Sequence, residues 1–274
     1  MTDRAFTPAL GRFFPTRFYD AVATLLRERL WRSLLAMHVA PRPDDVIVDV
    51  GCGTGSQVLL LSRIEPRARL IGVDPDPDVL AVAQRKAGTA SAASTAGAAG
   101  AAGTAGIAGA TGIAGAAGTA GIAGAAGAAG TAGIAGTAGA AGVADAAVPA
   151  AQWRVGMGDS LEELLGAGSA STVVSSLVLH QCPMAMKQAI LASMFAVLRP
   201  GGKLVIADYG LQRTKPMRLA FRVVQLADGV ADTQPNADGV LPRLMSEAGF
   251  VDVREAEVVS TISGSISIYV AHRE

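Results

Sequence analysis

Apolar residues recur along this chain with two different periods, which alternate for most of its length. Spacings near three and four predict amphipathic helices, and short continuous apolar runs predict strands buried on both faces. Helices are expected at 16–38, around 58–61, and at 77–87, 160–165, 184–198, 216–229 and 239–248. Strands are expected at 46–50, 70–73, 152–155, 172–179, 203–207, 251–260 and 265–271.

This alternation predicts an α/β domain that ends in a pair of neighbouring strands. Strands that alternate with helices form a mostly parallel sheet with helices on both faces, and the short link at Gly264 favours a closing antiparallel hairpin. We therefore expect an N-terminal helical cap over residues 1–44 and a main domain made of 45–86 and 145–274.

The segment between the two parts of the main domain, residues 87–144, differs from the rest of the chain. Glycine stands at every third position from Gly97 to Gly142, and no charged residue occurs between 87 and 143. Alanine and glycine give too little apolar surface for a membrane span, and the tract has no proline to favour a collagen helix. We expect a low-complexity loop remote from the ligand crevice, although an ordered glycine-rich solenoid or an assembly role stays open.

Charge and cysteine content narrow the function classes. Basic and acidic residues number 23 each, so bulk charge gives no reason to expect nucleic acid as a partner. The two cysteines, Cys52 and Cys182, are far apart, which favours a reduced, cytoplasmic setting. No membrane span is expected, and the oligomeric state does not follow from the sequence.

A glycine-rich turn follows the first predicted strand and is the main candidate for a ligand site. The strand 46–50 contains Asp49 and leads into Gly51-Cys52-Gly53-Thr54-Gly55, and the next strand ends at Asp74. Glycines let a ligand approach the backbone, and an acid at the tip of the second strand can accept hydrogen bonds from ribose hydroxyls. The spacing differs from the G-x-G-x-x-G turn of dinucleotide-binding proteins. This difference counts against an NAD(P)-dependent oxidoreductase, which we keep as a less favoured alternative.

These residues resemble the motif of class I S-adenosylmethionine-dependent methyltransferases, roughly (V/L)-(L/V)-D-(V/L)-G-(C/T)-G-(T/P)-G with an acid after the second strand. The resemblance implies a Rossmann-like, seven-stranded sheet and methyl transfer from S-adenosyl-L-methionine to a small-molecule acceptor. The turn Arg199-Pro200-Gly201-Gly202 favours the group that resembles quinone-biosynthesis methyltransferases. RNA or protein acceptors and a non-catalytic role stay open. The chemistry requires no metal, and no cluster at metal-ligand spacing is seen.

The resemblance also implies roles for single residues. Asp49, Gly51, Gly53 and Gly55 are expected at the methionine end of the cofactor, and Cys52 and Thr54 of the same turn are further cofactor-binding candidates. Asp74 is expected at the ribose, Pro75 near the adenine, and Asp159, after Gly158, at the adenine amino group. The chain supplies further candidates at Leu179 and at Tyr19, whose helix resembles the lid of small-molecule methyltransferases.

His180 is the candidate catalytic residue. It follows the fourth predicted strand, and the carboxyl ends of parallel strands face the ligand. A histidine there can serve as a general base or as a substrate contact, while a buried structural histidine is the simpler alternative. Arg222, Gln225 and Asp228 share one side of the helix at 216–229 and are candidates to cover the substrate, or else a solvated face.

Overall fold

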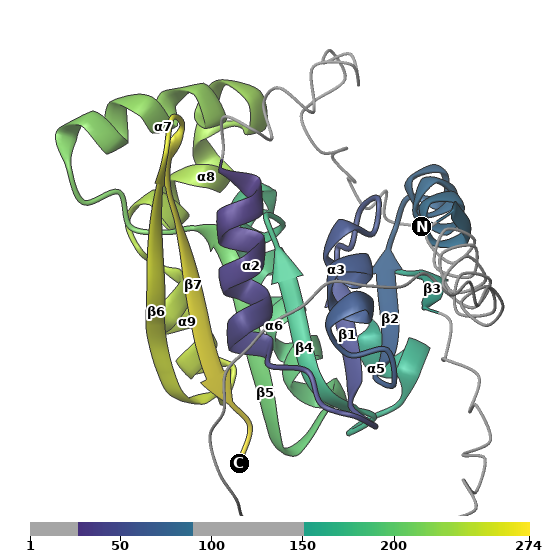
Figure 1. Ribbon diagram of the computed structural model, residues 1–274. Helices are drawn as coiled ribbons and strands as arrows, with labels where there is room; N and C mark the ends of the chain where they lie inside the picture. The colour runs from purple at the N-terminus through teal and green to yellow at the C-terminus, as the bar shows by residue number, and fades with distance from the viewer. Residues whose placement is uncertain (1–26, 90–150) are drawn as a thin grey trace, which may run out of the picture. The chain divides into compact units, whose positions relative to one another are not determined.

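The computed structural model describes residues 27–89 and 151–274 (Figure 1). These residues fall within one compact unit. Most of the expected insertion, the first part of the expected helix 16–38 and Tyr19 therefore lie outside the described residues.

A seven-stranded sheet in the order β3-β2-β1-β4-β5-β7-β6 forms the centre of this unit. The first five strands are parallel, β7 runs antiparallel to β5, and β6 pairs antiparallel with β7. The strands are β1 (Val46–Val50), β2 (Arg69–Asp74), β3 (Gln152–Val155), β4 (Ala170–Ser176), β5 (Leu198–Tyr209), β6 (Val251–Thr261) and β7 (Gly264–His272). The predicted fold class, with its C-terminal antiparallel hairpin, is confirmed.

Helices cover both faces of the sheet. α2 and α3 lie on one face, and α5, α6 and α9 lie on the other (Figure 1). The helices are α2 (Glu28–Val39), α3 (Ser56–Ile64), a helix over 77–89, α5 (Leu161–Leu165), η2 (a 3-10 turn, Leu179–Gln181), α6 (Met184–Val197), α7 (Lys215–Asp228), α8 (Val230–Ala237) and α9 (Leu241–Glu247). None of the helices in these ranges is long and apolar enough to cross a membrane.

The fourth strand ends earlier than the apolar pattern predicts. It stops at Ser176 instead of residue 179, because Leu177 turns into the left-handed region with φ 57° and the chain continues as η2. The side chain of Asp208 on β5 stabilises this turn, since its Oδ2 accepts the backbone N–H groups of Leu179 (2.7 Å) and His180 (3.3 Å). Polar contacts from another strand thus decide where β4 stops.

The apolar pattern did not predict two further local features. Residue 160 lies before α5, and its hydroxyl donates to Asp159 Oδ1 instead of capping the helix; the hydroxyl of Ser193 accepts the Leu161 N–H at 2.8 Å. The helix α8, which contains Pro235, was not expected, because the segment is short and polar and has a proline inside it.

Candidate functional site

The turn between β1 and α3 needs its three glycines. Gly51, Gly53 and Gly55 have φ angles of 70°, 53° and 76°, a region that residues with a side chain rarely adopt. A Cβ on Gly51 would lie 2.3 Å from a Val178 methyl carbon, and one on Gly55 would lie 2.4 Å from the ring of Trp153. A Cβ on Gly53, by contrast, would have no atom within 4 Å. The turn is closed on two sides and open at Gly53.

Asp74 ties the glycine turn to the end of β2. Its Oδ2 accepts the Gly53 N–H at 2.9 Å, and its Oδ1 accepts the N–H of Asp76 at 3.0 Å. Burial raises the pKa of the Asp74 carboxyl. Each carboxylate oxygen keeps a second lone pair, so the side chain can still accept hydrogen bonds from a ligand. Pro75 follows directly and is half-buried.

Asp49 is a buried carboxyl group without a hydrogen-bond partner. Its side chain is 2% exposed, and neither oxygen has a partner within the described residues. Burial raises its pKa to about 7; the Arg32 guanidinium on α2 opposes this shift. A buried carboxylate that lacks a partner is costly, so this position suits a ligand that brings a cation or several hydrogen-bond donors.

Other side chains around the turn are engaged in protein contacts. Thr54 Oγ1 accepts a hydrogen bond of 2.7 Å from the Lys86 ammonium. Cys52 is buried, and burial raises the pKa of its thiol far above the ordinary range, so it stays protonated. The segment after β3 also approaches β1, since a Cβ on Gly158 would lie 3.0 Å from Val50 Cγ1. The half-buried Asp159 accepts the Ser160 hydroxyl at 3.0 Å.

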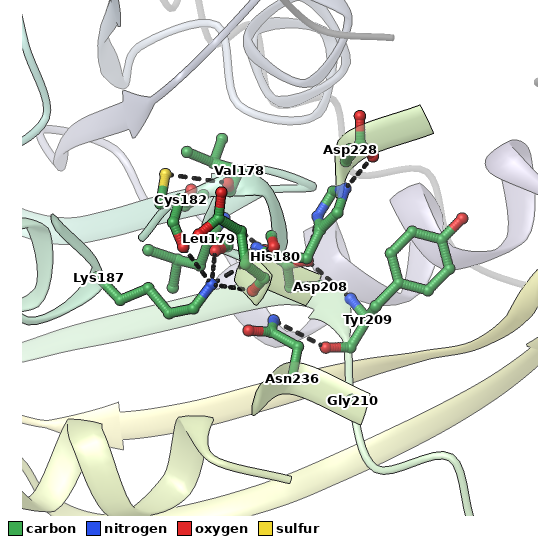
Figure 2. Close-up of polar contacts among 12 residues, drawn as sticks. Val178, Leu179, His180, Cys182, Lys187, Asp208, Tyr209, Gly210, Asp228 and Asn236 are labelled. Atoms are coloured by element: carbon green, nitrogen blue, oxygen red, sulfur yellow. Dashed lines mark hydrogen bonds and ion pairs between the residues drawn. The ribbon is translucent and has the colours of Figure 1, made fainter. Parts of the chain in front are cut away.

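His180 lies between two carboxylates (Figure 2). Its Nδ1 is 2.7 Å from Asp208 Oδ1 and its Nε2 is 3.4 Å from Asp228 Oδ2, and all three side chains are at most 7% exposed. Burial disfavours the charged ring, but both carboxylates outweigh this effect and raise the pKa of His180 to about 9. At neutral pH the ring is therefore an imidazolium that donates from both nitrogens, and neither is free to accept a proton.

Lys187 on α6 holds the chain around His180 in place (Figure 2). Its fully buried ammonium donates to the carbonyl oxygens of Leu179, Cys182 (2.7 Å) and Asp232 (2.9 Å). Burial lowers the pKa of this lysine. We call Lys187, His180, Asp208 and Asp228 the polar clamp, because together they join η2 to β5, α6, α7 and α8.

Within the described residues, which leave out Tyr19, the structure thus brings the expected site residues to one edge of the sheet. The ends of β1, β2 and β4 and the segment after β3 carry Asp49, the glycine turn, Asp74, Gly158, Asp159, Leu179 and His180. Asp208 and Lys187 were missed, because a lone buried charge on a strand or a helix gives no local signal. Trp153, which closes the turn, was read only as part of a strand. No group of three His, Cys, Asp or Glu residues in 27–89 and 151–274 could hold a metal ion.

Comparisons with known proteins agree with this geometry. Residues 47–102 match the model of a methyltransferase domain family, and residues 86–147 match the collagen triple helix repeat, in which glycine also recurs at every third position. A demethylmenaquinone methyltransferase of Symbiobacterium thermophilum is 34% identical over 76 residues, which is 26% of this chain and 30% of the relative. A ribosomal RNA small subunit methyltransferase H of Chromobacterium violaceum is 46% identical over 54 residues, 19% of this chain and 17% of the relative. The matched segments thus span less than a third of these relatives.

Solved structures extend the similarity to the whole fold. The magnesium protoporphyrin IX methyltransferase of Synechocystis PCC 6803 with bound SAH aligns with a TM-score of 0.58 at 16% identity, over 95% of this chain and 90% of that chain. A putative O-methyltransferase from Nostoc punctiforme PCC 73102 aligns with a TM-score of 0.57 at 17% identity, over 94% of this chain and 59% of that chain. The chain has the fold of class I S-adenosylmethionine-dependent methyltransferases, and the resemblance found in its motif is confirmed.

Proposed function

We propose that this protein transfers a methyl group from S-adenosylmethionine to a small-molecule acceptor. The observation that carries the proposal is the buried carboxyl group of Asp49, which has no partner within the described residues and adjoins a glycine turn that is open at Gly53. The cofactor has an ammonium group that can pair with such a carboxylate, and the match to the methyltransferase domain family supports this choice of ligand.

The residues around the turn fit the different parts of this cofactor. We assign Asp49 to the ammonium group, the backbone of residues 51–55 to the carboxylate, and Asp74 to the ribose hydroxyls. Asp159, with Gly158 beside it, is our candidate for the adenine amino group. S-adenosylmethionine supplies a methyl group on a positively charged sulfur, which is already activated for in-line displacement. The protein's task is to align the acceptor and to exclude water.

We assign His180 a positioning role instead of the role of a general base. Both of its ring nitrogens bind carboxylates, and its raised pKa keeps it protonated at neutral pH. A protonated, doubly engaged imidazole cannot take a proton from an acceptor. Its position supports the view that it fixes η2, and thereby Leu179, at the end of β4.

For the acceptor we favour a quinone-type aromatic ring. The Symbiobacterium relative is named for demethylmenaquinone, and it shares 34% identity over its matched segment. Transfer of a labelled methyl group to demethylmenaquinone, with small-subunit ribosomal RNA as the competing acceptor, tests this choice. Label in the RNA alone would contradict it. We also propose a cytoplasmic setting, with which the free thiols of Cys52 and Cys182 agree.

Titration calorimetry with S-adenosylhomocysteine tests the cofactor site. Because the pKa of Asp49 is about 7 and the ligand's ammonium favours the carboxylate, affinity should rise between about pH 5.5 and about pH 8 and then level off. Asp49→Asn should lower the affinity at pH 8 about tenfold and remove this pH dependence. Asp44→Asn, a change at an exposed carboxylate, is the control. Equal affinity of Asp49→Asn and wild type at every pH would overturn the assignment.

Two other functions remain as alternatives with their own tests. An NAD(P)-dependent oxidoreductase would be stabilised against heat by NADH and not by S-adenosylhomocysteine. An assembly role of the repeat tract is favoured by the match of residues 86–147 to the collagen repeat. Deleting residues 97–142 separates that role from methyl transfer, because a passenger tract would leave both cofactor affinity and oligomeric state unchanged.

A further inference from the structure

The outer face of α7 carries apolar side chains that no other described part of the chain, 27–89 or 151–274, covers. Leu219, Val223 and Leu226 are 75%, 65% and 87% exposed. They follow each other at spacings of four and three residues, so they lie on one face of the helix. Isolated exposed apolar residues are common, but a row of three on one helix face needs an explanation.

The inner face of α7 is fixed, so the helix cannot turn to bury this row. Phe221 and Val224 are buried against the core. Asp228 binds His180 in the polar clamp, and the Gln225 side-chain amide donates to Gln234 Oε1 of α8 at 2.8 Å. Rotation of the helix would break these contacts, so the apolar row stays on the outer side of α7.

Basic side chains accompany the apolar row. Lys215, Arg218 and Arg222 are exposed, and Arg222 lies one turn from both Arg218 and Leu226. Arg218 pairs with Asp238, whereas Lys215 and Arg222 have no ion pair within the described residues. No acidic residue occurs between 215 and 227, although the whole chain has a formal net charge of zero. Up to Asp228, this helix therefore carries three basic side chains and no acidic one.

We propose that the outer face of α7 binds the surface of an anionic lipid bilayer. A helix with leucines on one face and cations alongside lies in the interface between headgroups and acyl chains. The stems of Lys215 and Arg222 can run beside the leucines while their charged ends reach lipid phosphates. We favour a bilayer over a protein groove because Leu226, at 87% exposure, projects from the surface without neighbouring walls.

This inference goes beyond the proposed function and does not depend on it. It implies that the reaction takes place near a membrane surface. Asp228 on the inner face of α7 binds His180, which follows Leu179 at the edge of the proposed site. A bilayer on the outer face of α7 would lie close to that edge. An acceptor dissolved in the lipid would then have a short path to the site.

Flotation of the full-length protein with vesicles tests the proposal. The protein should float with equimolar phosphatidylcholine and phosphatidylglycerol, less with phosphatidylcholine alone, and less at high salt. The double variant Leu219→Ser/Leu226→Ser should reduce the partition coefficient about tenfold or more. Arg222→Gln should reduce it about fivefold, which corresponds to about 1 kcal/mol per basic residue.

Matched variants keep the test specific. Val155→Ser is the control for the apolar changes, because it removes an exposed valine (57%) from β3 at the far edge of the sheet. Arg199→Gln is the control for Arg222→Gln, because it removes an exposed arginine from the turn at the start of β5. Both control variants should float like wild type. A cooperative urea-unfolding transition like that of wild type shows that each variant is folded. Absence of flotation, or flotation that Leu219→Ser/Leu226→Ser leaves unchanged, overturns the proposal. A second result also overturns it: light scattering shows a dimer for wild type and a monomer for the double variant, and neither protein binds vesicles. The row would then be an interface between two copies of the chain.

Discussion

Replacing His180 by glutamine should remove a pH-dependent part of the protein's stability. The imidazolium binds Asp208 and Asp228, and these carboxylates overcome the effect of burial and raise its pKa from 6.5 to about 9. Because one pKa unit corresponds to about 1.4 kcal/mol, protonation of His180 adds about 3 kcal/mol to the free energy of unfolding, net of the cost of burying the charged ring. The ring is only 7% exposed, so solvent weakens this contribution little.

The sign follows from the direction of the shift. The pKa of His180 is higher in the folded protein than in the unfolded chain, so the contribution is complete below about pH 6.5 and is lost as the pH rises through about 9. Urea unfolding at a series of pH values from about 6 to about 10 measures it. Over this range the free energy of unfolding of wild type should fall by about 3 kcal/mol more than that of His180→Gln.

A second variant guards against an indirect effect of the substitution. Asp228→Asn keeps the imidazole and removes one of its two carboxylates, so it should lose part of the pH dependence. The reasoning is refuted if the wild-type and His180→Gln curves run parallel across the whole range. A ring titration near pH 6.5, observed for His180 by NMR in the folded protein, would refute it independently.

Four other substitutions test the site and its supports. Gly51→Ala should lower the free energy of unfolding by at least about 2 kcal/mol, because its Cβ would overlap Val178 and its φ is positive. Gly53→Ala should lower it by only about 1 kcal/mol but should weaken cofactor binding. Thermal melts with and without S-adenosylhomocysteine measure the stability and the cofactor binding of both variants. Lys187→Met should cost about 3 kcal/mol in urea unfolding, since it leaves buried carbonyl groups without a donor; a loss below about 1 kcal/mol would contradict this. Asp74→Ala should weaken S-adenosylhomocysteine binding at least tenfold, about 1.4 kcal/mol by calorimetry, and unchanged binding would count against the ribose role.

Local patterns predicted the order of the elements well. The runs at 46–50 and 70–73 became β1 and β2 with bounds shifted by at most one residue, and 152–155 became β3. These strands are short, apolar and bounded by turn residues, so the hydrophobic pattern alone carries the information. The positive φ angles of Gly51, Gly53 and Gly55 likewise follow from the residue type.

Contacts between distant residues could not be predicted in this way. The end of β4 depends on Asp208, 28 residues beyond His180, and the charge of His180 depends on the same residue and on Asp228. A histidine after a strand predicted either a base or a buried structural group. Only the distances to both carboxylates favour the second, because they show that each ring nitrogen is engaged.

The polar clamp also gives a physical route between the glycine turn at residues 51–55 and α7. Val178 packs where a side chain of Gly51 would stand, and it directly precedes η2. η2 is held by Asp208 and Lys187, and His180 within it binds Asp228 of α7. A shift of α7, at a lipid surface or over an acceptor, must therefore either break a buried ion pair or move η2 against the glycine turn. Because breaking a buried pair is costly, we expect η2 to move, and with it the glycine turn that we propose as the cofactor site.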